Sequence, residues 1–171
     1  MTSILCFSRN RCTSVEQIDE NTMRSSCHLQ DSLMDALVEI AVKLPDLEIT
    51  GIKAGVRRSR MGVDPEGINA LQKAVGVRVG PGMLKIIKGL IGGEGDLQEL
   101  AFMVEECCHG VILSFTKEEL LKTPQEEEAA REHFAGLVRE NIRLYNRCAA
   151  FAAGSSFVEG IEPPKGMSEA E

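Results

Sequence analysis

The chain has no tryptophan, one tyrosine and six phenylalanines among its 171 residues. Because aromatic side chains are so scarce, aliphatic residues, methionine and cysteine must form most of the core. The other proportions, 43% hydrophobic and 26% charged residues, are those of an ordinary globular protein. A chain of this length can enclose one core with modest tails. We therefore expect a single domain over residues 1–159 and a disordered tail over residues 160–171.

Long apolar runs are also missing. No stretch approaches the roughly 20 apolar residues of a membrane span, and the first residues lack the apolar run of a signal peptide. The six cysteines form no CxxC pair. These absences favour a reducing cytoplasm with free thiols over a disulfide framework, and they disfavour a membrane partner.

Positive charge is in deficit, since the formal net charge is −7. An acidic chain is poorly suited to track phosphates, so we expect no nucleic-acid partner. A local basic cluster is interpreted as a solvated strand end; it comprises Lys53, Arg57, Arg58 and Arg60. Neither GxxxxGK[ST] nor GxGxxG occurs, and no Ser/His/Asp arrangement is visible among the three histidines.

The first half of the chain alternates between apolar and polar residues, which is typical of strands. Residues 3–7, 11–18 and 22–30 are predicted to be extended, with a turn at Glu20-Asn21. Residues 33–42 contain good helix formers but also alternate. We interpret them as a strand because the Pro45-Asp46 turn and the alternating residues 47–56 follow. These segments predict an antiparallel meander of about four strands.

The second half changes to helical periodicity. Helix starts are expected at Asp64-Pro65, at Pro81, at Asp96 with a capping box to Glu99, and at Thr123-Pro124. Residues 83–91 are apolar nearly all round, which predicts a central, buried helix. The last helix should run over residues 124–153, and its apolar stripe suggests a homo-oligomer. The fold class is therefore α+β: a meander packed by three to four helices, the last of them long.

Two glycine turns each lead into a helix, Gly80-Pro81-Gly82 and Gly92-Gly93-Glu94-Gly95. Free backbone N–H groups at such turns can bind an anion, which makes Gly80, Gly82, Gly93 and Gly95 candidates. Glu94 and Asp96 would repel a phosphate. The alternative is that the glycines only end one helix and begin the next.

The same stretch resembles the bacterial family called domain of unknown function 2889. Family members read roughly GLRIGPGF, then a basic apolar helix, then GGxxGCTHLxELL, and this chain reads GVRVGPGM, LKIIKGL and IGGEGDLQELA. Upstream, Asp31–Val42, Leu47–Ile49 and Arg57-Arg58 occupy further family positions, so the resemblance covers about residues 22–115. Asp96 and Gln98 stand where the family has Cys and His, and residues 61–67 lack a second family Cys. A thiol or metal site formed by those family residues would lack two ligands here.

The sharpest cluster of chemically active residues is Cys107-Cys108-His109, with Cys27-His28 as partners from the first half. Thiolates and imidazoles bind zinc or an iron–sulfur cluster. Adjacent helix residues point about 100° apart, so at most two of the three could face one ion. Alternatively, Cys108 packs in the core and His109 lies on the rim. The candidate metal ligands are Cys27, Cys107, Cys108 and His109.

Three functions remain open. The first is a non-catalytic binding or accessory module of the cytoplasm, which needs no cofactor. The second is a thiol or metal protein carrying zinc or an iron–sulfur cluster, because strands followed by helices resemble the iron–sulfur cluster assembly scaffold. The third is a small-molecule enzyme with a pocket between sheet and helices. Convergence of Cys27 with Cys107 and Cys108 would favour the second, and a closed sheet–helix interface would disfavour the third.

Overall fold

The computed structural model describes residues 4–60, 62, 65–146 and 148–163. Contacts within the chain define two compact units, an N-terminal unit, Met1–Thr116, and a C-terminal unit, Lys117–Glu171. Each unit is described by itself below. The single domain over residues 1–159 stays a prediction, because compact units need not fold separately. Of the expected tail, residues 164–171 lie outside the described residues, whereas Ile161 packs against a small core.

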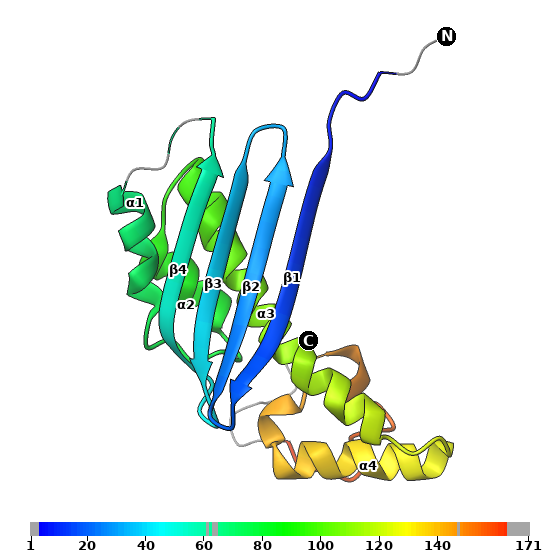
Figure 1. Ribbon diagram of the computed structural model, residues 1–171. Coiled ribbons are helices and arrows are strands. Elements are labelled where there is room, and N and C mark those ends of the chain that lie inside the picture. Colours follow the sequence, from blue (N-terminus) through cyan, green and yellow to red (C-terminus); the bar gives the residue numbers. More distant parts are fainter. Residues whose placement is uncertain (1–3, 61, 63–64, 147, 164–171) are drawn as a thin grey trace. The chain divides into compact units, whose positions relative to one another are not determined.

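The N-terminal unit contains a four-stranded sheet in the order β1-β2-β3-β4, in which consecutive strands are antiparallel (Figure 1). The strands are β1 Arg9–Asp19, β2 Thr22–Asp31, β3 Asp35–Lys43 and β4 Glu48–Arg58. The predicted meander is confirmed, including the strand for residues 33–42. This segment forms a strand despite its helix-forming residues, because its alternating pattern buries Ala36, Val38, Ile40 and Val42 on one face of the sheet.

One face of the sheet is covered by helices (Figure 1). These are α1 Pro65–Ala70, a 3₁₀ turn Leu71–Ala74, α2 Met83–Ile91 and the first part of α3 Asp96–Lys122. Fully buried side chains from β2, β3 and α3 form the core between them, among them Leu29, Ile40, Leu100, Met103 and Val111. The other face carries mostly polar side chains. The predicted cap Asp64 lies outside the described residues, and Asp96 opens α3 as expected.

Helix α2 lies at the surface, so the prediction of a central helix is wrong. Met83, Ile87 and Ile91 are buried against the unit. Leu84 on one edge of this buried stripe is 39% exposed, and Ile86 and Leu90 on the other edge are 51% and 40% exposed. The side turned away from the unit carries Lys85, Lys88 and Gly89, so the helix is amphipathic rather than apolar all round.

The C-terminal unit contains α4 Glu127–Glu140 followed by two 3₁₀ turns, Ile142–Leu144 and Ala149–Phe151. The predicted helix over residues 124–153 is therefore wrong at both ends. Thr123 does not cap it, because the Thr123 hydroxyl donates to the carbonyl of Glu119 in the preceding helix. Beyond Asn141 the chain folds back, and a small core covers the apolar stripe; it comprises Val138, Tyr145 and Val158, with Ile142, Leu144, Phe151 and Ile161 packed against it. Among the described residues, no helix is long and apolar enough to cross a membrane.

Candidate functional site

Cys27 and Cys107 are close enough to interact electrostatically, but the four predicted metal ligands do not form one group. Cys27, Cys107 and Cys108 are fully buried between the sheet and α3, where the Cys107 thiol donates to the carbonyl of Val38 at 3.6 Å. His109 turns outward, with its side chain 44% exposed and its Nδ1 3.8 Å from a carboxylate oxygen of Glu106. Within the described part of the chain, no three His, Cys, Asp or Glu side chains are grouped so that they could hold a metal ion.

Burial also decides the chemistry of these thiols. It raises the pKa of Cys27 and of Cys107, and it raises the pKa of Cys108 to about 12. The thiolate is the nucleophile and the metal ligand, so protonated thiols in the core are inert. All six cysteines are free, as their scattered spacing predicts.

The two glycine turns shape the backbone around α2 and α3. Gly82 precedes α2 with φ 85°, and Gly93 and Gly95 precede α3 with φ 104° and 59°. The carbonyls of Gly80, Gly82 and Gly95 accept the N–H groups of Met83, Ile86 and Glu99. These contacts support the alternative that the glycines end one helix and begin the next. Anion binding at Gly80, Gly82, Gly93 and Gly95 stays a prediction.

A polar network lies at the end of the sheet where β2 turns into β3, and Asp31 is its centre. The Asp31 side chain is 0% exposed. Its Oδ1 accepts the N–H groups of Leu33 and Met34 at 2.7 Å, and its Oδ2 accepts Nε of Arg9 at 2.8 Å. Burial alone would raise the pKa of Asp31, but these hydrogen bonds outweigh burial and hold the pKa below its ordinary value.

The network continues to α3. Glu99 accepts Arg11 at 3.1 Å and lies 3.5 Å from Arg9, and the Arg11 guanidinium stacks 4.4 Å from the centroid of Phe102. The Ser59 hydroxyl donates to the Asp96 carboxylate, so the end of β4 meets the start of α3. The positive charges of Arg9 and Arg11 are thus balanced by the carboxylates of Asp31 and Glu99. The network joins strand ends to α3. Sequence reasoning missed it because these residues are far apart in the chain.

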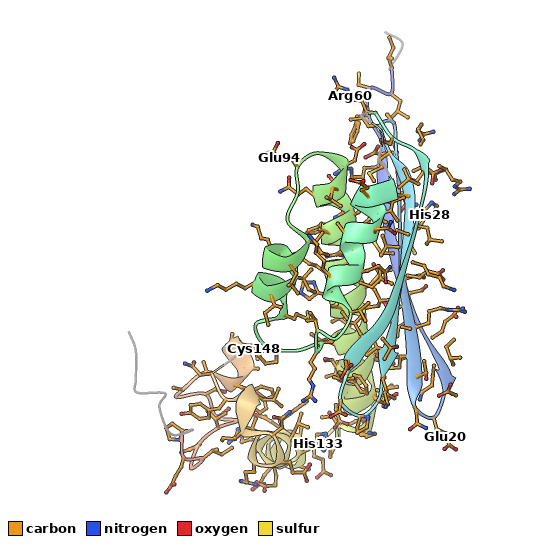
Figure 2. All side chains as sticks on the ribbon, turned by 90° about the vertical axis from the view of Figure 1, so that its left-hand side faces the viewer. Glu20, His28, Arg60, Glu94, His133 and Cys148 are labelled. Carbon is orange, nitrogen blue, oxygen red and sulfur yellow. The ribbon has the colours of Figure 1, made fainter. Side chains whose placement is uncertain are left out.

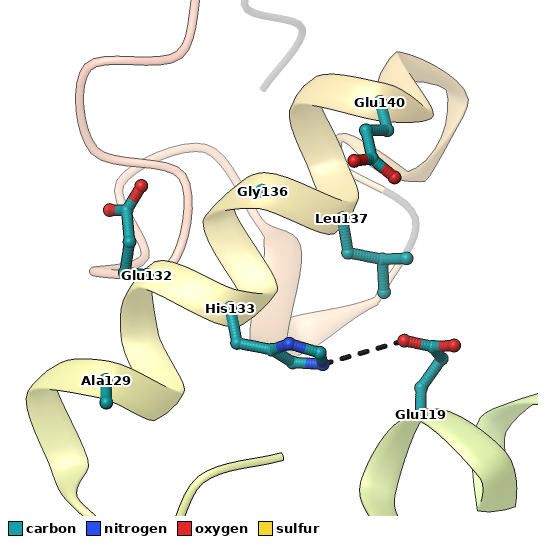
Figure 3. A pocket seen from close by; sticks show the side chains of 7 residues that line it. All are labelled: Glu119, Ala129, Glu132, His133, Gly136, Leu137 and Glu140. Atoms are coloured by element: carbon teal, nitrogen blue, oxygen red, sulfur yellow. Dashed lines mark ion pairs between the residues drawn. The ribbon is translucent and has the colours of Figure 1, made fainter. Parts of the chain in front are cut away.

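A hollow of about 480 Å³ lies in the C-terminal unit between the end of α3 and one side of α4 (Figure 3). Its lining is Glu119, Ala129, Glu132, His133, Gly136, Leu137 and Glu140. Glu119 is shared between His133 Nε2 at 3.5 Å and Lys122 at 3.0 Å. Glu132 accepts Arg139 at 2.6 Å, which lowers the pKa of Glu132. Two of the three carboxylates thus already have cationic partners, which weakens the hollow as a site for a cationic ligand.

Comparison of the chain with protein-family models, with curated proteins and with solved structures finds no match.

Proposed function

We propose that the chain is a non-catalytic binding or accessory module of the cytoplasm and that it self-associates. The observation that carries the proposal is one edge of α2, where Ile86 and Leu90, four residues apart, are 51% and 40% exposed. Clustered exposed apolar side chains mark contact surfaces. We call these two residues the α2 face.

The interior of the N-terminal unit supports a binding role over catalysis. The space between sheet and helices is filled by side chains with little or no exposure, among them Val38, Ile49, Leu71, Ile87 and Val104. The thiols there are held protonated by burial. Neither the small-molecule enzyme nor the metal carrier gains support from this interior.

A second copy of the chain suits the α2 face best. Two molecules that each carry a net charge of −7 repel one another. Lys85 and Lys88 lie on the same helix as the α2 face, and their positive charge reduces the repulsion between two acidic copies there. Gly89 beside them is exposed and adds no side chain that would hinder approach.

Membership of the family of domain of unknown function 2889, and with it a bacterial source, belongs to the same proposal. Its support is the set of glycines in the family-like stretch GVRVGPGM-LKIIKGL-IGG, where Gly76, Gly82 and Gly92 have φ of 90°, 85° and 60°. Residues with a side chain rarely adopt such angles, which gives a physical reason for glycine in that frame.

Light scattering of the purified protein across a wide concentration range tests self-association. We expect wild type to give the mass of a dimer or larger oligomer, and Leu90→Glu and Ile86→Glu to give a monomer. The matched control is Leu37→Glu, because Leu37 is 42% exposed but lies on the opposite face of the sheet. A monomeric wild type at high concentration, or equal dissociation by the control, would contradict the proposal. Stoichiometric zinc or iron in protein purified without oxygen would instead favour the metal carrier.

A further inference from the structure

The face of the sheet opposite the helices brings together Cys12, His28 and Asp35, which are separated in the sequence. In the β1–β2 register Cys12 is the direct partner of His28. The neighbouring rows fix the face, because Ser14 and Ser26 share a hydrogen bond of 2.9 Å and Arg24 pairs with Glu16. Directly opposed residues of an antiparallel pair have Cβ atoms about 4.5–5.5 Å apart. Cys12 is exposed, and Figure 2 shows His28 on the side away from the helices.

The imidazole of His28 is held in place by the start of β3 and the end of β4. Its Nε2 lies 3.0 Å from Oδ1 of Asp35, whose side chain is only 12% exposed. Arg57 lies 3.2 Å from the same oxygen and 3.3 Å from His28 Nε2. Because Nε2 is engaged, Nδ1 is the ring nitrogen that can take a proton from a neighbouring thiol.

Asp35 and Arg57 both contact the His28 ring. Along the same face Glu16 opposes Arg24 and Glu39 opposes Lys53, so these charges occur in pairs of opposite sign. A cysteine opposite an imidazole that a carboxylate orients is an arrangement of nucleophile, base and orienting group.

We propose that Cys12 is a reactive thiol and a site of mixed-disulfide formation with low-molecular-weight disulfides. His28 takes the proton from Cys12 Sγ, and the thiolate attacks one sulfur of the disulfide R–S–S–R. A new S–S bond forms at Cys12 while the original S–S bond breaks. The leaving thiolate takes the proton from His28 and departs as RSH, so the Cys12 sulfur is oxidised and the departing sulfur is reduced.

The chain contains its own comparison thiols. Cys27, Cys107 and Cys108 are buried, whereas Cys6 and Cys148 are exposed like Cys12. Neither Cys6 nor Cys148 lies in a strand, so neither has a cross-strand histidine. A difference in rate between Cys12 and these two exposed thiols therefore reports on the His28–Asp35 pair rather than on accessibility.

The experiment treats the native, reduced, full-length protein with oxidised glutathione and follows each cysteine by peptide mass spectrometry. We expect the Cys12 adduct to form at least about tenfold faster than adducts at Cys6 and Cys148. His28→Asn should remove this advantage, and Asp35→Asn should reduce it. The control His109→Asn changes an exposed histidine on α3 and should leave all rates unchanged. Circular dichroism and thermal unfolding verify the fold of each variant.

Two results would overturn the proposal. One is a wild-type Cys12 that reacts no faster than Cys6 and Cys148, a measurement that needs no variant. The other is a folded His28→Asn protein whose Cys12 keeps the wild-type rate. Iodoacetamide labelling across pH separates thiolate formation from access of the larger disulfide, because it should show the same ranking of the three exposed cysteines.

Discussion

Asp31 shows how one side chain can hold a strand connection. It is a buried carboxylate that accepts two backbone N–H groups in the turn after β2 and a guanidinium from β1. Alanine would leave these donors without their acceptor, at a cost of about 1–3 kcal/mol. We expect Asp31→Ala to lower the free energy of unfolding, measured by urea denaturation, by that amount.

The matched control is Asp46→Ala. Asp46 makes only a long, exposed pair with Arg78 at 3.9 Å, so its removal should change stability by less than about 0.5 kcal/mol. Equal losses in the two variants would show that the Asp31 contacts do not stabilise the fold.

The same carboxylate predicts a pH dependence. Its folded-state pKa lies below the ordinary value, so it stabilises the fold above an ordinary aspartate pKa of about 3.9. That contribution is lost as the pH falls through the folded-state pKa. We expect the wild-type free energy of unfolding to decrease on acidification below about pH 4, and Asp31→Asn to show a shallower decrease. Urea titrations of both proteins across that range measure it, and parallel curves would contradict the prediction.

At the scale of elements, α3 comes close to the sheet at Gly110. A Cβ at this position would lie 2.9 Å from Thr13 Cγ2 and 3.1 Å from Val15 Cγ2. Both neighbours are β-branched and have little rotamer freedom, so they cannot easily move aside. Overpacking should exceed the gain in helix propensity, and we expect Gly110→Ala to destabilise the protein by about 1–2 kcal/mol.

Gly136→Ala is the control within α4, since a Cβ there would meet nothing within 4 Å. It should stabilise the protein by about 0.5–1 kcal/mol through helix propensity alone. Thermal unfolding of the two variants measures the difference, and a stabilised Gly110→Ala would show that the helix can move away from the sheet.

For the whole molecule, self-association through the α2 face predicts a concentration-dependent melting temperature. Mass action favours the folded oligomer as protein concentration rises. A tenfold increase should raise the wild-type melting temperature by roughly 2–5 °C. The monomeric Leu90→Glu variant should melt at one temperature throughout, and a concentration-independent wild type would argue against the α2 face as an interface.

Local patterns in the sequence predicted the four strands of the sheet and the positions of the main turns, whereas residues 4–7, also expected to be extended, lie outside the strands. Alternation over residues 33–42 and 47–56 places every second side chain on one face, and that preference needs only near neighbours in the chain. Free thiols also followed from spacing. The boundaries of the last helix did not follow, because residues after Asn141 could bury the same apolar stripe by folding back, and both solutions satisfy the pattern.

Tertiary structure alone decided which of the chemically active residues meet. The sequence points to Cys107, Cys108 and His109 because they are adjacent, yet helix geometry turns the thiols inward and His109 outward. Cys12, His28 and Asp35 share no local motif and lie on three strands, so only the sheet register brings them together. Helix α2 is a further case, since its sequence shows many apolar residues and only packing shows that Ile86 and Leu90 stay partly exposed.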